Sequence, residues 1–249
     1  MQNIIVVVPC YNEAERFNAQ RFVSAAQADP SLSFLLVDDG STDATRAILE
    51  RASQQLPAQI QALGLAQNSG KAEAVRRGLQ AAFERAPAVV AYFDADLATP
   101  LEELAPMRAL LEERPELHAV LGSRVGLLGR DVVRTPTRHY LGRIFASVAS
   151  VLLDLNVYDT QCGAKLFRNT PAVREIFAEP FHVSWTFDVE VLARLAKLAR
   201  DGTVAPLARS AMEYPLRRWR DVSGSKLEPS AALKAGSELA TLWYRYGRK

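Results

Sequence analysis

Short apolar runs alternate with longer amphipathic segments along the first half of this 249-residue chain. The runs are typical of buried strands, and the segments between them are typical of helices. The expected strands are Ile4–Val8, Ser33–Val37, Ile60–Ala66, Val89–Phe93 and His118–Ser123. The expected helices are Glu15–Gln27, a segment capped by Asp43 that runs to about Gln54, Lys71–Arg85 and Leu101–Glu113. This alternation predicts an α/β fold in which helices cover both faces of a mostly parallel sheet.

Acidic side chains recur where the expected strands end. Glu13 follows the first strand, Asp38 and Asp39 follow the second, and Asp94 and Asp96 follow the fourth. Because ligands of parallel sheets bind beyond the carboxyl ends of the strands, we expect these carboxylates to gather at one edge of the sheet. Local explanations stay open for two of them. Asp39 fits turn chemistry, and Glu13 fits a position favoured by a helix dipole.

The triplet Asp94-Ala95-Asp96 lies at the turn after an apolar strand, where the two carboxylates can converge on one ion. Paired carboxylates suit a hard divalent cation that also binds substrate phosphates. Taken alone the triplet also fits a solvated turn. Lys71 follows Gly70 at an expected helix start, where an anion would sit, although an ordinary surface lysine has the same pattern. The glycine spacing of a P-loop is missing.

Net charge and its distribution restrict the partners. The formal net charge of +2 gives no reason to expect a nucleic acid partner. Residues 205–249 carry nine Lys and Arg against four Asp and Glu, an excess that suits phosphates or an anionic membrane, or simply a solvated basic end.

Cysteine usage and hydropathy indicate the compartment. Cys10 and Cys162 are far apart in sequence, and we expect two buried thiols rather than a disulfide or a zinc site. We expect no signal peptide, and the apolar stretch Ile144–Leu153 is too short to cross a bilayer. The expected location is cytoplasmic, with peripheral attachment at the membrane face as the alternative.

Several motifs, taken in order, resemble family 2 glycosyltransferases of the GT-A, Rossmann-like fold. The N-terminal motifs are Val8-Pro9-Cys10-Tyr11-Asn12-Glu13, Val37-Asp38-Asp39-Gly40-Ser41-Thr42-Asp43, Asn68-Ser69-Gly70-Lys71 and Asp94-Ala95-Asp96. The later motifs are Gly122-Ser123-Arg124, Asp159-Thr160-Gln161-Cys162-Gly163, Lys165-Leu166-Phe167, Trp185-Thr186-Phe187-Asp188-Val189-Glu190 and Gly224-Ser225-Lys226-Leu227. These later motifs are similar to the polyprenyl (dolichyl) phosphate sugar transferase branch, and most of all to its dolichyl-phosphate β-glucosyltransferase type.

The resemblance implies a binding site for a nucleotide-sugar donor. The implied donor-binding residues are Pro9, Tyr11, Glu13, Val37, Asp39, Lys71, Asp94, Ala95 and Asp96. Asp94 and Asp96 are also implied as ligands of Mg²⁺ or Mn²⁺ bridging the diphosphate. Mannosyl-type relatives often carry a further glutamine ligand two residues after the second aspartate. This chain has Ala98 there, which indicates fewer protein ligands and argues against a mannosyl donor.

The resemblance also implies how a polyprenyl phosphate acceptor is bound. Arg124 matches the phosphate-binding arginine of the family, and Lys226 matches a basic loop over the site. A phosphate oxygen is already anionic near neutral pH and needs little help from a base. A sugar hydroxyl acceptor would need a base, and Asp188 is then the first candidate, although it also fits a helix N-terminal or supporting carboxylate. Weaker candidates for binding the acceptor are Arg143, Arg218 and Arg220.

We therefore predict a GT-A domain over residues 1–228 and an amphipathic helix over residues 229–249, which either belongs to that domain or faces a membrane or partner. Apolar positions recur at helical spacing at Tyr140, Leu141, Ile144, Phe145, Val148, Val151, Leu152 and Leu155, and again at Ala235, Leu239, Leu242, Trp243 and Tyr246. Each set fits an interfacial membrane helix or a helix packed inside the protein. A homo-oligomer or a membrane-protein partner is the alternative to direct membrane contact.

The predicted activity is an inverting, metal-dependent transfer of a hexose, glucose from UDP-glucose, to a polyprenyl phosphate. Inversion is implied by the resemblance alone. A family 2 transferase that acts on a sugar hydroxyl is the alternative enzyme. A non-catalytic protein that binds nucleotide-sugars is the alternative of another class.

Overall fold

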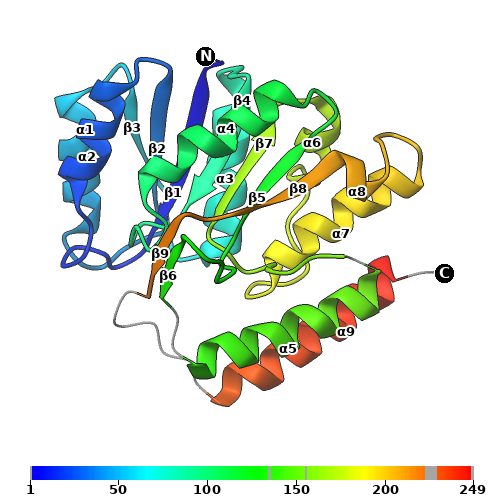
Figure 1. Ribbon diagram of the computed structural model, residues 1–249. Helices are drawn as coiled ribbons and strands as arrows, with labels where there is room; N and C mark the ends of the chain where they lie inside the picture. Colours follow the sequence, from blue (N-terminus) through cyan, green and yellow to red (C-terminus); the bar gives the residue numbers. More distant parts are fainter. Residues whose placement is uncertain (1, 134–135, 155, 222–228, 248–249) are drawn as a thin grey trace. The chain divides into compact units, whose positions relative to one another are not determined.

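The computed structural model describes residues 2–133, 136–154, 156–221 and 229–247 (Figure 1). Its contacts divide the chain into two compact units. Unit 1 consists of Met1–Leu97 and Gly163–Ala178, and unit 2 consists of Ala98–Cys162 and Glu179–Lys249. The predicted division at residues 228 and 229 stays a prediction.

A mostly parallel sheet forms the centre of unit 1. Its strands are β1 (Ile4–Cys10), β2 (Leu32–Asp38), β3 (Ile60–Gly64), β4 (Val89–Phe93) and β7 (Ala164–Arg168). They lie in the order β3-β2-β1-β4-β7, with every pair parallel except β4 and β7, which run antiparallel. The carboxyl ends of β1, β2 and β4 therefore meet at one edge of the sheet, as the sequence predicts.

Continuous apolar strands fit this arrangement because helices cover them. The helices of unit 1 are α1 (Ala19–Ala28), α2 (Thr45–Gln55), α3 (Lys71–Glu84) and α6 (Pro171–Ile176). Gly78 of α3 lies so close to the side chains of Val7 and Val37 that a Cβ atom there would overlap both. The missing side chain lets α3 pack tightly on β1 and β2.

The prediction that the first helix begins at Glu15 was wrong. The carbonyl of Glu13 accepts hydrogen bonds from the N–H groups of Arg16 and Phe17, which close a separate turn. Helix α1 begins only at Ala19, where the Asn18 side chain caps it by accepting from the Arg21 N–H at 3.3 Å. A side-chain cap of this kind satisfies a helix donor that has no partner inside the helix, so it marks the start of the helix.

The start of α2 is one residue from the predicted one. Ala44 occupies the N-cap position. Asp43 contributes from one residue further out, where its carboxylate accepts from the Thr45 N–H at 2.9 Å. The same carboxylate accepts from the Ala14 N–H at 3.1 Å, so it serves the loop after β1 as well.

Unit 2 has its own strand pairs and helices. Parallel strands β5 (Ala119–Ser123) and β8 (Ala211–Pro215) form one pair, and β6 (Asp131–Val133) and β9 (Arg218–Arg220) form another. The helices are η1 (Leu101–Glu103), α4 (Leu104–Glu113), α5 (Pro136–Leu153), α7 (Phe187–Arg200), α8 (Leu207–Ser210) and α9 (Pro229–Tyr246). The predicted helix over Leu101–Glu113 thus begins with a 3₁₀ turn, η1, and continues as α4.

Helices α5 and α9 lie side by side, and α9 also packs on α7 (Figure 1). The α9 residues Ala235, Leu239 and Leu242 are buried, so most of the predicted apolar stripe packs inside unit 2. Trp243 and Tyr244 are exposed near the end of α9. On α5, Val148 and Val151 are exposed, whereas the side chains of Tyr140, Leu141, Ile144 and Leu152 lie outside the described residues, as does the whole of Leu155.

Among the described residues, no helix combines the length and apolarity that a membrane crossing requires. Contact of α5 or α9 with a membrane surface stays a prediction. Cys10 and Cys162 are buried free thiols, which confirms the expectation from their spacing. Burial raises the pKa of the Cys10 thiol, and the negative charges of Glu13 and Asp38 add to the rise.

Candidate functional site

The end of β2 is tied to the loop before α3 by the Asp39 carboxylate. Asp39 is almost fully buried and accepts hydrogen bonds from the N–H groups of Ser69 and Gly70, both at 2.8 Å, and from the Asn68 side chain at 3.1 Å. Burial raises the pKa of Asp39, although the Ser69 and Gly70 N–H groups oppose the rise. Asp39 thus fixes the loop that carries Lys71, the first residue of α3.

The turn after β2 depends on glycine. Gly40 has φ of +67°, and a Cβ atom there would overlap the backbone of Gln67 and Asn68. The Asp38 carboxylate accepts from the Ser41 N–H at 3.1 Å, and Asn12 accepts from the Thr42 N–H at 2.9 Å. These hydrogen bonds agree with the turn chemistry predicted for this motif, and they join the loops that follow β1 and β2.

Glu13 lies in a negative field. Its carboxylate pairs with Arg16 at 2.7 Å, and its backbone N–H donates to Thr45 Oγ1 at 2.7 Å. Burial raises the pKa of Glu13, the Arg16 pair opposes the rise, and the charges of Asp96 and Asp94 add to it. The loops after β1 and β4 therefore bring three carboxylates close enough to repel one another, which makes this edge attractive to a cation.

Asp94 and Asp96 lie in a tight turn directly after β4. The Asp94 N–H donates to the carbonyl of Gly163 at 2.9 Å, and Leu97 takes a positive φ of 54° to complete the turn. A Cβ atom at Gly163 would overlap the Asp94 carboxylate, so only glycine leaves that carboxylate its place. Lys71 Nζ lies 2.5 Å from Asp94 Oδ1, and both side chains are partly exposed.

The chemistry of this pair fits a hard divalent cation. Magnesium is commonly held by one or two carboxylates, with substrate phosphates and water completing the shell. Asp94 and Asp96 offer that oxygen set. Among the residues that the structure describes, no group of three His, Cys, Asp or Glu side chains forms a complete metal centre.

The remaining predicted donor-binding residues differ in how far their side chains are exposed to solvent. Tyr11 is 44 % exposed beside the end of β1, and Pro9 is half-buried. The Val37 side chain is fully buried under α3, and Ala95 is nearly so. Of these predicted residues, Tyr11 offers a large exposed ring.

In unit 2, Arg124 follows β5 and is clamped by Asp159. The guanidinium donates from Nε at 2.7 Å and from Nη2 at 2.8 Å to the two carboxylate oxygens, and the Arg124 N–H adds a third hydrogen bond at 3.0 Å. The Trp219 ring lies 5.3 Å from the guanidinium, and the Asp159 N–H donates to Glu213 at 2.8 Å. A bidentate pair of this kind fixes the plane and direction of an arginine.

Asp188 is the second residue of α7 and is buried. The loop before it is held by Glu238 of α9, whose carboxylate accepts from the N–H groups of Ser184, Trp185 and Thr186 at 2.8–3.2 Å. Burial favours the neutral form of Glu238, but these donors outweigh it and lower its pKa. Sequence reasoning missed Glu238, although a charge between the apolar positions 235, 239 and 242 was a usable signal.

A second buried carboxylate, Glu190 of α7, was also missed. Its side chain is fully buried and contacts His182 Nδ1 at 2.7 Å, Arg194 Nη2 at 2.8 Å and the Tyr246 hydroxyl at 3.0 Å. This cluster joins the ends of α7 and α9 to the loop that begins near Pro180. Its role is to hold the structure together.

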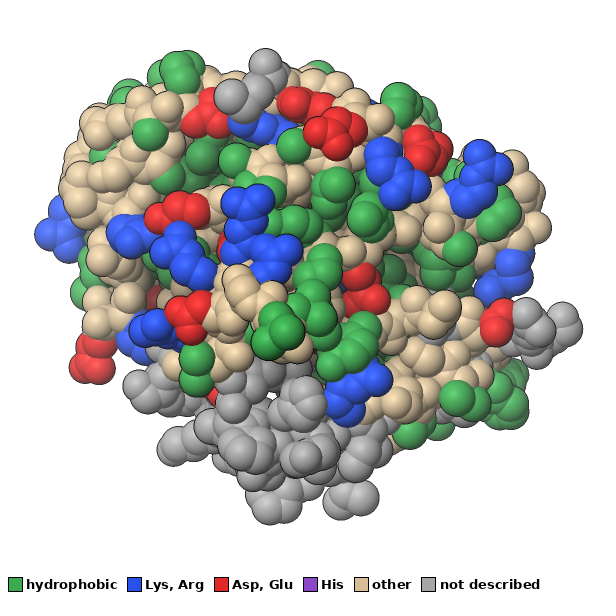
Figure 2. Space-filling model, in the orientation of Figure 1, with side chains coloured by type: hydrophobic (Ala, Val, Ile, Leu, Met, Phe, Trp, Pro, Cys, Tyr) green, Lys and Arg blue, Asp and Glu red, His purple; other side chains and the backbone are tan. Residues whose placement is uncertain are grey.

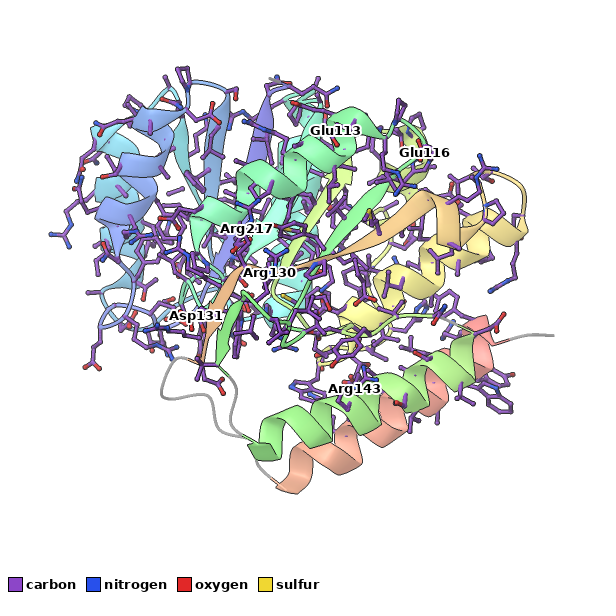
Figure 3. All side chains as sticks on the ribbon, in the orientation of Figure 1. Glu113, Glu116, Arg130, Asp131, Arg143 and Arg217 are labelled. Carbon is purple, nitrogen blue, oxygen red and sulfur yellow. The ribbon has the colours of Figure 1, made fainter. Side chains whose placement is uncertain are left out.

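The weaker predicted acceptor-binding arginines are all engaged. The Arg143 guanidinium lies 3.7 Å from the centre of the Tyr158 ring, Arg218 Nη2 lies 3.8 Å from Glu102 Oε2, and Arg220 Nη2 lies 2.8 Å from Asp131 Oδ2. Figure 3 labels Arg143 and Asp131. Lys226 and its loop lie outside the described residues.

Comparisons with known proteins agree with this fold. Residues 5–174 match the family model described as glycosyl transferase family 2, and the chain belongs to this family. It is 32% identical to the dolichyl-phosphate beta-glucosyltransferase of Dictyostelium discoideum, over 97% of this chain and 74% of that protein. It is 30% identical to the dolichyl-phosphate beta-glucosyltransferase of Homo sapiens, over 98% of this chain and 76% of that protein.

A solved structure with the same fold is glucosyl-3-phosphoglycerate synthase from Mycobacterium tuberculosis, in complex with Mn²⁺, UDP-glucose and phosphoglyceric acid. The TM-score is 0.64 at 18% identity, covering 98% of this chain and 79% of that one. The predicted family and the GT-A fold class are confirmed. The protein is a glycosyltransferase enzyme.

Proposed function

We propose that this glycosyltransferase moves glucose from UDP-glucose to the phosphate of a polyprenyl phosphate, with inversion at the anomeric carbon. The observation that carries the proposal is the likeness to dolichyl-phosphate beta-glucosyltransferases at about 30% identity over nearly the whole chain. A transferase of undecaprenyl-phosphate also aligns over 64% of the chain. Both classes of relative are named for a lipid phosphate.

The donor side of the proposal lies in unit 1. The exposed ring of Tyr11 stacks on the flat base, beside the half-buried Pro9. Glu13 and Asp39 accept hydrogen bonds from the nucleoside, Glu13 through the carboxylate that now pairs with Arg16. Val37 is buried, so its part is to shape the floor of the site. Ala95 brings the chain close to the sugar without a bulky side chain.

Asp94 and Asp96 hold Mg²⁺ or Mn²⁺ in this proposal. When bound, the ion supplies Lewis-acid stabilisation of the leaving diphosphate. Lys71 pairs with Asp94 in the structure. Lys71 is the first residue of α3, where anions are favoured, and there it would contact a diphosphate oxygen.

The acceptor side of the proposal lies in unit 2. The attacking phosphate oxygen is already anionic, because the second pKa of a phosphate monoester is about 6. The protein therefore has to orient the phosphate rather than deprotonate it. Arg124 does this from a direction fixed by Asp159, and Lys226 adds a second positive charge. A sugar hydroxyl acceptor would instead need a base, and Asp188 at the start of α7 is the candidate for that role.

The test is transfer of radiolabelled sugar from UDP-glucose to a polyprenyl phosphate, with Mn²⁺ or Mg²⁺ and with EDTA. Metal-dependent label in the lipid phase is the expected result. Label that appears only on a soluble sugar, with dependence on Asp188 and not on Arg124, would replace the acceptor with a hydroxyl. Donor binding with neither transfer nor hydrolysis would support a non-catalytic binding protein.

A further inference from the structure

The loop between β5 and β6 carries the most exposed large apolar side chain of the described residues. Leu128 is fully exposed, at 104%, and Leu127 beside it is 48% exposed. The Arg130 N–H donates to the Leu127 carbonyl at 3.1 Å and closes a turn in which Gly129 takes φ of +80°. This turn, rather than chance rotation of one side chain, holds Leu128 away from the protein.

Two unpaired arginines lie beside this turn. Within the part of the chain that the structure describes, the guanidinium groups of Arg130 and Arg217 form no ion pair. The Asp131 N–H donates to the Arg217 carbonyl at 2.8 Å, so the residues that carry the two charges are neighbours. Figure 3 labels both arginines, and Figure 2 shows, in the same orientation, that Lys and Arg side chains lie beside exposed hydrophobic ones on this face. The neighbouring Arg220, in contrast, is neutralised by Asp131.

We propose that Leu127 and Leu128 form a membrane-docking tip that enters the interface of an anionic phospholipid bilayer, while Arg130 and Arg217 bind its phosphate headgroups. The exposed leucines match the acyl boundary of such a surface. The unpaired positive charges beside them match its anionic headgroups. The proposal rests on the proposed function, because a polyprenyl phosphate is reached only at a membrane surface.

The length of the loop agrees with this placement. Arg124 precedes Leu128 by four residues, a path of at most roughly 14 Å even when extended. Interfacial apolar groups enter about 5–10 Å into the boundary between headgroups and acyl chains. A docked tip therefore keeps Arg124 near the headgroup level, where the phosphate of a lipid acceptor lies.

Other exposed apolar residues of unit 2 provide matched controls. Val151 on α5 is 82% exposed, yet the Arg143 guanidinium of the same helix is already held by Tyr158. Trp243 near the end of α9 is 55% exposed and belongs to the helix that the sequence predicted as interfacial. Variants at Val151 and Trp243 show whether vesicle binding depends on the tip itself, on any exposed apolar side chain, or on an anchor carried by α9.

The experiment is flotation of the full-length protein with vesicles of phosphatidylcholine alone or mixed with phosphatidylglycerol. We expect binding to the mixed vesicles, at least tenfold weaker for Leu127→Ser/Leu128→Ser. Arg130→Gln/Arg217→Gln should weaken binding to the mixed vesicles about fivefold for each charge removed. The binding of this variant should also depend less on salt concentration than that of the wild type. Val151→Ser should bind as the wild type does.

Three results would overturn the proposal. They are a wild-type protein that ignores anionic vesicles, tip variants that bind normally, and binding lost with Trp243→Ser but kept by the tip variants. Tip variants that change self-association in sedimentation without changing vesicle binding would assign the tip to a second copy of the chain instead. Circular dichroism of each variant checks the fold.

Transfer to a short-chain, water-soluble prenyl phosphate separates this proposal from the proposed function. A tip variant should keep that transfer and lose transfer to a vesicle-embedded acceptor. If the wild type transfers sugar to neither acceptor while vesicle binding still depends on the tip, the proposed function fails and the docking surface stands. If soluble and embedded acceptors are used equally by the tip variant, the docking proposal fails alone.

Discussion

Carboxylates have different surroundings in the two units of this glycosyltransferase. In unit 1, Asp94 is partly exposed and pairs with Lys71, whose side chain is itself 44% exposed. In unit 2, Glu190 is fully buried among an arginine, a histidine and a tyrosine, and Asp159 is committed to Arg124. The difference teaches that the turn after β4 in unit 1 leaves Asp94 accessible to a cation, whereas the buried carboxylates of unit 2, like Asp39 in unit 1, fix loops and cations of the protein itself.

The largest expected effect tests whether the carboxylates after β4 in unit 1 bind a cation. Asp96→Ala removes a hard oxygen ligand from the turn after β4, and we expect transfer to fall about a thousandfold, the equivalent of about 4 kcal/mol in the barrier. The free energy of unfolding should stay within about 0.5 kcal/mol of the wild type. Initial rates at several Mn²⁺ concentrations, together with denaturant unfolding, measure both.

The control for this variant is Glu50→Ala, an exposed carboxylate of α2 that pairs with Arg46 at 3.1 Å. It should leave the rate unchanged and lower the free energy of unfolding by less than about 1 kcal/mol. Wild-type turnover in Asp96→Ala would show that Asp96 is not a ligand of the metal. The contrast drawn between the two units would then be wrong.

The next effect tests the structural use of carboxylates in unit 2. Glu190→Ala leaves the buried Arg194 guanidinium without its partner, and breaking a buried pair in this way costs about 3–5 kcal/mol. The exposed pair of Arg46 and Glu50 has the same four-residue spacing, and Glu50→Ala should cost under about 1 kcal/mol. Urea unfolding measures the free energy of unfolding that each of the two variants loses. Equal losses would mean that burial does not distinguish these pairs.

The two units also differ in how far the sequence predicts them. In unit 1, the strand Val89–Phe93 and the acidic turn after it are local patterns, because strand ends and turn residues are neighbours in sequence. The start of α1 was misplaced because capping by Asn18 competes with helix propensity over only a few residues. In both cases the interactions that determine the local structure join residues only a few positions apart in sequence.

The contacts of unit 2 join distant segments. Glu238 accepts from Thr186, 52 residues away, and Arg124 pairs with Asp159, 35 residues away. No local periodicity carries such pairings. The motif residues Arg124, Asp159 and Asp188 could therefore be named from their neighbours in sequence. The pairing of Arg124 with Asp159, and the contact of Glu238 with the loop before Asp188, could not.

A smaller effect concerns acceptor binding in unit 2. Arg124→Gln should raise the acceptor KM about 10- to 100-fold while leaving UDP-glucose binding unchanged, because it removes a charge-assisted contact to phosphate. Asp159→Asn should raise it less, since the arginine remains but loses its fixed direction. Steady-state kinetics with varied acceptor, combined in a double-mutant cycle, shows whether the two act as one unit. Unchanged acceptor kinetics in both variants would count against the assignment.

The smallest effect is a pH dependence in unit 2. The pKa of Glu238 is lowered in the folded state, so its ionised form stabilises the fold above the ordinary glutamate pKa of 4.5, and this contribution is lost as the pH falls through the lower folded value. Glu238→Gln cannot ionise, and we expect it to be about 1–2 kcal/mol less stable than the wild type at neutral pH. That gap should narrow below pH 4.5. Urea unfolding across this range measures it, with Glu50→Gln as the exposed control. A gap that stays constant with pH would show that the loop before α7 is held by packing rather than by the charge of Glu238.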